Sequence, residues 1–216
     1  MDLEIKNFDL NKINTGVSLL FGATKSGKTI FINNLIEHLY KKSIKTFIIK
    51  EDYDYFNLRD IIDEQMYNKD IKTIAIIFDN INTINNDLYH IMENSKNLDI
   101  ICIIVCNNIL INDIGNCIER IMILNVQNDE YKKQIYNTYL KKYIEDEEMF
   151  DTIYEECTKN YEMLIFDKND NITYWYKSEL KEDDNSDNSD EEEYNEYISC
   201  FDFEWLYDYY RVFICL

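Results

Sequence analysis

The sequence predicts an α/β fold in which a mostly parallel five-stranded sheet is covered by helices on both faces. Short apolar runs rich in β-branched residues alternate along the chain with segments of helical periodicity. Continuous apolar strands of this kind are typical of a parallel sheet that is buried on both sides. A turn at residues 22–29 with a glycine near each end separates the first apolar run from the first helical pattern. The 216 residues suffice for one such domain with additions, but not for two full domains and a linker.

The expected elements follow the apolar pattern in chain order. Strands are expected at residues 17–21, 45–50, 72–79, 99–106 and 120–126. Helices are expected at residues 28–41, 56–68, 85–97, 129–142 and 145–159. Residues 161–167 and 171–177 are strand-like runs on either side of the turn sequence KNDN. They predict a C-terminal β-hairpin that adds an antiparallel edge to the sheet.

Composition divides the chain into three parts. Residues 1–178 are expected to form the folded domain. Residues 179–196 carry ten acidic residues and one lysine, have almost no apolar side chains, and are expected to be disordered. Residues 197–216 are rich in aromatic side chains at helical spacing and predict a short amphipathic element. This element either folds back onto the surface of the domain, which we favour, or is tethered to a partner protein.

The turn GATKSGKT fits the phosphate-binding pattern G-x-x-x-x-G-K-[ST]. Glycines allow the backbone to turn tightly between a strand and a helix, so that N–H groups converge on phosphate oxygens at the positive end of the helix dipole. Lys28 is expected to contact the β- and γ-phosphates of ATP, and the Thr29 hydroxyl to ligate Mg²⁺. The residues expected to bind the nucleotide are Gly22, Ala23, Thr24, Lys25, Ser26, Gly27, Lys28 and Thr29.

A second apolar run, TIAIIFDN, contains Asp79, which is expected at the carboxyl edge of the sheet, where it orients Mg²⁺ opposite Thr29. One predicted strand separates this run from the phosphate loop in the sequence. This spacing is compatible with the additional-strand class of NTPases, which includes helicases, motors and DNA translocases. Nucleotide kinases are less well supported, because they usually clamp a second phosphorylated substrate with several arginines and this chain has three.

Asn107 follows the next predicted strand and is a candidate sensor that hydrogen-bonds the γ-phosphate or the attacking water. Asn108 could take the same role. The alternative is that Asn107 is an ordinary loop residue.

Charge and cysteine content limit the function classes. The formal net charge is −20, of which residues 179–196 supply −9 and the rest −11, so a contact with DNA needs a local lysine cluster. The six cysteines show no C-x-x-C pair and no metal-ligand spacing with histidine, and we expect buried thiols in a reducing compartment. Without an apolar run that could span a bilayer, or a cleavable signal, we expect a soluble, intracellular protein that does not enter a membrane.

The order of these motifs resembles that of the genome-packaging ATPases of the FtsK/HerA superfamily, in the short viral branch found in poxviruses, other large eukaryotic DNA viruses and virophages. The matching segments, within about residues 13–177, are GATKSGKT, YDYFNLRDIIDEQ, IAIIFDN, CNN, RIMIL with the following EYKKQIYNTYL, and ITYWYK. The resemblance implies a homo-oligomeric ring that hydrolyses ATP to push double-stranded DNA into a capsid. It also implies a capsid protein as partner, and the virion or the viral factory in the host cytoplasm as location.

One departure from the family pattern concerns catalysis. The family usually follows the metal-binding aspartate with a second acid that polarises the attacking water, and here that position is Asn80. Glu51 or Asp52, after the predicted strand 45–50, could replace the missing acid if that strand lies beside the strand of the phosphate loop. The alternative is that both belong to a solvated turn.

A second departure concerns arginine. The family tends to place an arginine shortly before the strand that corresponds to RIMIL, where this chain has Gly115 or Asn116. Arg120 lies several residues later. It is either an arginine finger that acts on a neighbouring subunit or an exposed arginine with a structural role.

These observations favour an ATP-hydrolysing motor subunit of viral DNA packaging. The candidate catalytic residues are Lys28, Asp79, Asn80, Asn107 and Arg120, and the candidate metal ligands are Thr29 and Asp79. Two alternatives remain open. Asn80 and the acidic surface also fit a nucleotide-binding regulatory or structural subunit with weakened hydrolysis. Another nucleic-acid translocase, helicase-like or conjugation-type, fits the same motifs.

Overall fold

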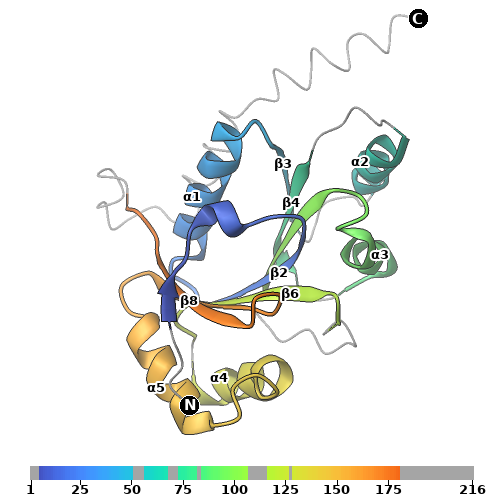
Figure 1. Cartoon of the computed structure of the whole chain (residues 1–216). Coiled ribbons are helices and arrows are strands. Elements are labelled where there is room, and N and C mark those ends of the chain that lie inside the picture. Colours follow the sequence, from blue (N-terminus) through green and yellow to red (C-terminus); the bar gives the residue numbers. More distant parts are fainter. Residues whose placement is uncertain are drawn as a thin grey trace, which may run out of the picture. The chain divides into compact units, whose positions relative to one another are not determined.

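The apolar runs of the sequence are strands of a single sheet, around which the helices pack (Figure 1). The structure is a computed structural model that describes residues 5–50, 56–67, 73–81, 84–106, 116–126 and 128–180. The described residues up to Glu179 belong to one compact unit. A second unit, Leu180–Leu216, is described only at Leu180, so the predictions about the acidic segment and the aromatic C-terminal element lie outside the described residues.

The sheet is mostly parallel, as predicted. Its strands are β1 (Ile5–Asn7), β2 (Gly16–Phe21), β3 (Lys45–Lys50), β4 (Ile74–Ile81), β5 (Ile100–Cys106), β6 (Ile118–Ile123), β7 (Glu162–Asp167) and β8 (Ile172–Lys177). Their order across the sheet is β1-β8-β7-β6-β2-β5-β4-β3. β7 is antiparallel to both of its neighbours, and all other neighbouring pairs are parallel. The last residues of β2, β4, β5 and β6 therefore share one edge of the sheet, which we call the carboxyl edge.

The helices lie close to their predicted positions. They are α1 (Lys28–Lys41), α2 (Phe56–Tyr67), α3 (Asn86–Asn94), α4 (Asp129–Ile135) and α5 (Glu147–Cys157), with a short 3-10 turn at Leu10–Lys12. Side chains of Asn85, Asn128 and Asp146 accept hydrogen bonds from first-turn N–H groups of α3, α4 and α5, which sets where these helices begin. The predicted helix 129–142 is interrupted, because Tyr136–Leu140 forms a π-helical turn.

Helices cover both faces of the sheet, as predicted (Figure 1). α1 packs on one face, where Phe31 and Leu35 join a cluster with Leu20 of β2. α2, α3, α4 and α5 pack on the opposite face, in a larger cluster that contains Leu19 and Phe21 of β2. Since successive side chains of a strand point to opposite faces, β2 is buried at every position. This burial explains why its sequence is mostly apolar, with Ser18 as its one polar side chain.

β7 and β8 form the predicted hairpin, with Asp167 and Ile172 opposite each other next to the turn. The sheet continues beyond this hairpin, because β1 pairs with β8 and is the outermost strand. β1 consists of three exposed residues without apolar alternation, so its sequence carries no strand signal. Tertiary pairing holds it in place, including a hydrogen bond from the Phe8 N–H to the Trp175 carbonyl at 2.8 Å.

The described cysteines are free thiols. Cys102, Cys106 and Cys157 are buried, as predicted, and Cys117 is partly buried. Burial raises the pKa of the Cys102 and Cys106 thiols above the ordinary value, which keeps them in the unreactive protonated form. Within the described part of the chain, no helix is long and apolar enough to cross a membrane, and no cluster of metal-ligating side chains is present.

α1 also contacts the segment that follows β8, the last strand in the chain. The Asn34 Oδ1 atom accepts a hydrogen bond from the Glu179 N–H at 2.8 Å, and the Asn34 side-chain amide donates to the Glu179 carbonyl at 3.1 Å. Residue 179 therefore belongs with the domain, whereas its acidic character suggested that it begins the disordered segment.

Deleting residues 181–216 is expected to leave the melting temperature of the domain nearly unchanged, because the acidic part of this segment has too few apolar side chains to offset its ordering entropy. Deleting 179–216 instead is expected to lower it by roughly 2–4 °C, since the hydrogen bonds to Asn34 are lost, at a cost of about 1 kcal/mol. Thermal unfolding followed by circular dichroism compares the two truncations. A large loss in the shorter deletion would mean that the aromatic C-terminal element is part of the fold.

Candidate nucleotide-binding site

The phosphate loop, residues 22–29, joins the end of β2 to the first turn of α1 at the carboxyl edge. β2 lies between β5 and β6, so the loop stands in the middle of the parallel strands. Two backbone hydrogen bonds hold its start: the Leu124 N–H donates to the Phe21 carbonyl at 2.8 Å, and the Ala23 N–H donates to the Asn125 carbonyl at 2.8 Å. The segment after β6 thus continues the pairing past the end of β2 and positions the loop.

Gly22 and Gly27 are both required by the shape of the loop. A Cβ atom on Gly22 would lie 2.4 Å from the Ser26 Oγ and 3.1 Å from the Leu124 Cβ, so these neighbours would have to shift to admit a side chain. Gly27 has a φ of +104°, in a region that other residues rarely adopt. Lys25 also has a positive φ, +65°. Alternation of ordinary and left-handed conformations turns successive N–H groups toward one concavity, the geometry of an anion-binding nest.

Lys28 places its ammonium group against the loop. Its Nζ donates hydrogen bonds to the carbonyl oxygens of Gly22 at 2.7 Å and Ala23 at 2.8 Å. Burial lowers the pKa of Lys28, an effect that the nearby charge of Asp79 partly offsets. Because burial disfavours the charged ammonium, an anion bound beside Lys28 would be stabilising.

The two hydroxyl groups at the end of the loop have different environments. Thr29 is exposed on the first turn of α1. The Ser26 Oγ is buried and has no hydrogen-bond partner among the described residues. Buried hydroxyl groups without a partner are uncommon in folded proteins. Because the Ser26 hydroxyl lies against Gly22 within the loop, it is suited to donate a hydrogen bond to a phosphate oxygen.

Asp79 and Asn80 lie at an irregularity near the end of β4. The pairing of β4 with β5 shifts between Phe78 and Ile81, so both residues stand out of the ladder with β5, although Asp79 still pairs with Lys50 of β3. Asn80 is exposed and has a φ of +60°, in the left-handed region where Asn and Asp are enriched among non-glycine residues. Asp79 is partly buried and close enough for its charge to act on Lys28, which brings two predicted site residues together.

The strand order brings the end of β5 between the phosphate loop and Asp79. Cys106, the last residue of β5, pairs with Phe21 on one side and with Ile81 on the other. The candidate sensor Asn107 and its neighbour Asn108 lie outside the described residues. The sensor role of Asn107 therefore stays a prediction, made for a residue that directly follows a suitably placed strand.

The condition for a replacement acid after β3 is not met. Glu51 or Asp52 could serve only if β3 lay beside β2, but β5 and β4 separate these two strands. β3 is the outermost strand on its side of the sheet. Glu51 and Asp52 themselves lie outside the described residues.

Arg120 is buried, which contradicts its expected exposure but fits a structural role, and the finger role stays a prediction. It lies in β6 with a side chain that is 2% exposed, and its Nε donates to the Asp167 Oδ2 at 2.8 Å. Its Nη2 donates to the Asn14 side-chain carbonyl. An arginine held in this way would have to break a buried ion pair before it could reach a neighbouring subunit. The geometry indicates that Arg120 joins β6 to β7. Of the other two positions considered, Asn116 is exposed, and Gly115 lies outside the described residues.

Tyr161 lies beside the loop and was not predicted as a site residue. It directly precedes β7, and a Cβ atom at Gly27 would lie 2.9 Å from its ring carbon Cδ1. Its side chain is nevertheless among the exposed large apolar ones, at 39%. No motif marks Tyr161 in the sequence, because its closeness to Gly27 arises from the pairing of β7 with β6.

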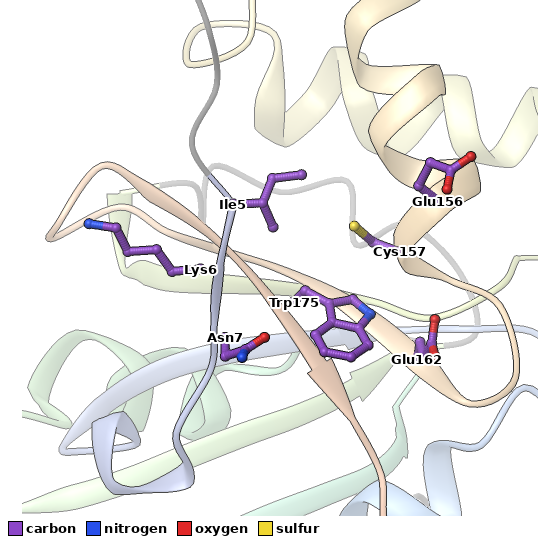
Figure 2. A pocket seen from close by; sticks show the side chains of 7 residues that line it. All are labelled: Ile5, Lys6, Asn7, Glu156, Cys157, Glu162 and Trp175. Carbon is purple, nitrogen blue, oxygen red and sulfur yellow. The ribbon is translucent and has the colours of Figure 1, made fainter.

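A recess of about 280 Å³ lies between β1 and the end of α5 (Figure 2). Figure 2 shows residues of β1 on one side, Glu156 and Cys157 on the other, and Trp175 between them. No residue of the phosphate loop lines this recess. It is therefore separate from the candidate nucleotide site.

No protein-family model and no curated protein sequence matches the chain. Among solved structures, the genome packaging NTPase B204 from Sulfolobus turreted icosahedral virus 2 in complex with ATPγS is similar, with a TM-score of 0.59 and 16% identity over 77% of this chain and 98% of that chain. Its AMPPCP complex gives a TM-score of 0.58 and 17% identity over 76% and 98%. B204, the DNA-packaging ATPase from Sulfolobus turreted icosahedral virus, gives 0.57 and 16% over 76% and 98%. The chain shares the fold of these NTPases over nearly their whole length.

Replacing Arg120 with methionine is expected to lower the free energy of unfolding by about 3–5 kcal/mol, because Asp167 would keep a buried charge without its partner. The double variant Arg120→Met/Asp167→Leu is expected to recover most of that loss, since neither charge remains. Urea unfolding followed by circular dichroism measures both. If Arg120→Met kept the stability of the wild type but lost ATP turnover, the finger role would be correct and the structural role wrong.

Proposed function

We propose that this chain binds Mg²⁺-ATP at the phosphate loop and hydrolyses it to move double-stranded DNA, as a motor subunit of viral genome packaging. The observation that carries the proposal is the phosphate loop, which holds the partly buried ammonium group of Lys28 at the centre of a parallel sheet edge, with Asp79 nearby. The shared fold of B204 supports it, because that protein is a genome packaging NTPase with structures in complex with ATPγS and AMPPCP.

The loop residues fit the phosphates of ATP, which would supply the transferable phosphoryl group. Lys28 would contact the β- and γ-phosphates, and the buried Ser26 hydroxyl would donate to a phosphate oxygen. Thr29 and Asp79 would hold Mg²⁺, because hydroxyl and carboxylate oxygens are the ligands this ion prefers. Together these groups would neutralise the charge of the triphosphate and fix its orientation before hydrolysis.

The residue after Asp79 limits how fast hydrolysis can be. Asn80 has an amide where the family pattern has a carboxylate, and an amide can orient a water molecule but is a poor base. Phosphoryl transfer depends mostly on positioning and on stabilisation of charge, so the loss of the acid would slow turnover without abolishing it. Asn107 is the proposed sensor that would help to orient the water.

A packaging motor requires partners besides ATP. We infer double-stranded DNA, further copies of this chain in a ring and a capsid protein, with the virion or the viral factory as the place of action. The family resemblance and the fold shared with a DNA-packaging ATPase support these inferences. With a net charge of −20, the chain would contact DNA through local lysines and not through its overall field.

Lys28→Ala is expected to weaken ATP binding about tenfold or more and to abolish turnover, because the triphosphate loses a partly buried cation. Thr29→Ala is expected to act mainly through the metal and to raise the Mg²⁺ concentration that turnover requires. Equilibrium binding of a fluorescent ATP analogue and phosphate release with and without long duplex DNA measure these effects. Lys41→Ala is the matched control, because Lys41 is an exposed lysine at the other end of the same helix.

Turnover that DNA stimulates in the wild type and that disappears in Lys28→Ala would support the motor. An ATP affinity that does not change in Lys28→Ala would remove the basis of the proposal.

Asn80→Asp is expected to raise the rate of hydrolysis about tenfold, equivalent to about 1.4 kcal/mol of barrier, because it supplies a carboxylate and tolerates the left-handed backbone as Asn does. Asn80→Glu also supplies a carboxylate, but it is expected to lose about 1 kcal/mol of stability at this φ. Single-turnover phosphate release and urea unfolding measure the two effects. The second candidate function, a nucleotide-binding regulatory subunit, is favoured by Asn80 itself. It would be correct if the wild type bound ATP without turnover and Asn80→Asp were no faster.

A further inference from the structure

The proposed function gives the bound nucleotide a direction along the carboxyl edge, and the present inference rests on that function. The terminal phosphate and Mg²⁺ would lie toward Asp79, on β4. β4 is on one side of β2, beyond β5, whereas β6 and β7 are on the other side. The α-phosphate, ribose and base must extend away from Asp79, so the base would lie on the side of the loop that faces the start of β7.

Tyr161 occupies this side of the loop. Its ring lies against Gly27, the residue that directly precedes Lys28, and the closest ring atom would be 2.9 Å from a Cβ at position 27. With 39% of its surface exposed, the side chain combines contact with the loop and access to solvent. A ring in this position offers an apolar surface directly beside the phosphate site.

The backbone around Tyr161 is held in an unusual conformation. Asn160 and Tyr161 have φ values of +51° and +64°, and a bulky residue such as tyrosine is an outlier in this region. The turn is closed by the Glu162 N–H, which donates to the Lys159 carbonyl at 2.9 Å. Strained backbone of this kind tends to occur at ligand-binding positions, where the surrounding structure enforces it. Here it directs the ring toward Gly27.

Charge distinguishes what can bind beside Tyr161. The next residue, Glu162, forms an ion pair with Lys177 at 3.2 Å, so the positive charge of Lys177 is compensated in this part of the edge. A second phosphate group is therefore disfavoured here, whereas a neutral base can stack on the ring. Stacking uses the π-face that every base has, so this contact would hold the base without selecting its identity.

We propose that the ring of Tyr161 is the surface on which the base of the bound nucleotide stacks. Tyr161→Ala is expected to weaken ATP binding about 5- to 100-fold and to leave the binding of inorganic tripolyphosphate unchanged. Tyr161→Phe is expected to keep the wild-type affinity for both, because the ring remains. Titration calorimetry with the Mg²⁺ complexes of ATP and of tripolyphosphate measures each affinity on the full-length chain.

The matched control is Tyr89→Ala, since Tyr89 is a tyrosine on α3 with a similar exposure of 38%. An unchanged affinity of Tyr161→Ala for ATP would overturn the inference and leave the proposed function in place. Equal weakening of ATP and tripolyphosphate would also overturn it, because Tyr161 would then support the loop through Gly27 without contacting the base. If the wild type bound neither ligand, the proposed function itself would fail, and this inference with it.

Discussion

The backbone hydrogen bonds between the end of β2 and the segment after β6 are the contacts on which the rest of the site depends. They involve the Phe21 carbonyl and the Ala23 N–H. The phosphate loop therefore follows a strand, β2, that is paired with β6 on one side and with β5 on the other. A turn with a positive φ at both Lys25 and Gly27 needs such support. With its start held, the close approach at Gly22 and the left-handed Gly27 direct Lys28 into the loop.

The part of the sheet beyond β6 contributes to the same site. The buried ion pair of Arg120 and Asp167 joins β6 to β7 away from the carboxyl edge, and the start of β7 then brings Tyr161 to Gly27. α1, whose first turn completes the phosphate loop, also binds the end of this extension through Asn34. The hairpin is therefore connected to the phosphate loop and to α1, and a change in the pairing of the hairpin would affect the phosphate loop.

Asn80 illustrates a conflict between backbone geometry and catalysis. The irregular pairing at the end of β4 requires a φ of +60°, which suits Asn and Asp better than Glu. An amide meets the conformational requirement but lacks the basicity that activates water. A carboxylate in this position would need to be short to meet both requirements. The position thus links the shape of β4 to the rate of the proposed hydrolysis.

The sequence by itself determined the phosphate loop, the parallel strands, the hairpin and the place of Asp79 at the end of a buried strand, because each depends on residues close together in the chain. Only the tertiary structure decided the strand order, the position of β1, the burial of Arg120 and the contact of Tyr161 with Gly27. These features join distant segments, such as Arg120 and Asp167, which are 47 residues apart, or Asn34 and Glu179, which are 145 apart. Local periodicity carries no information about such pairs, since they are selected by how the whole sheet packs.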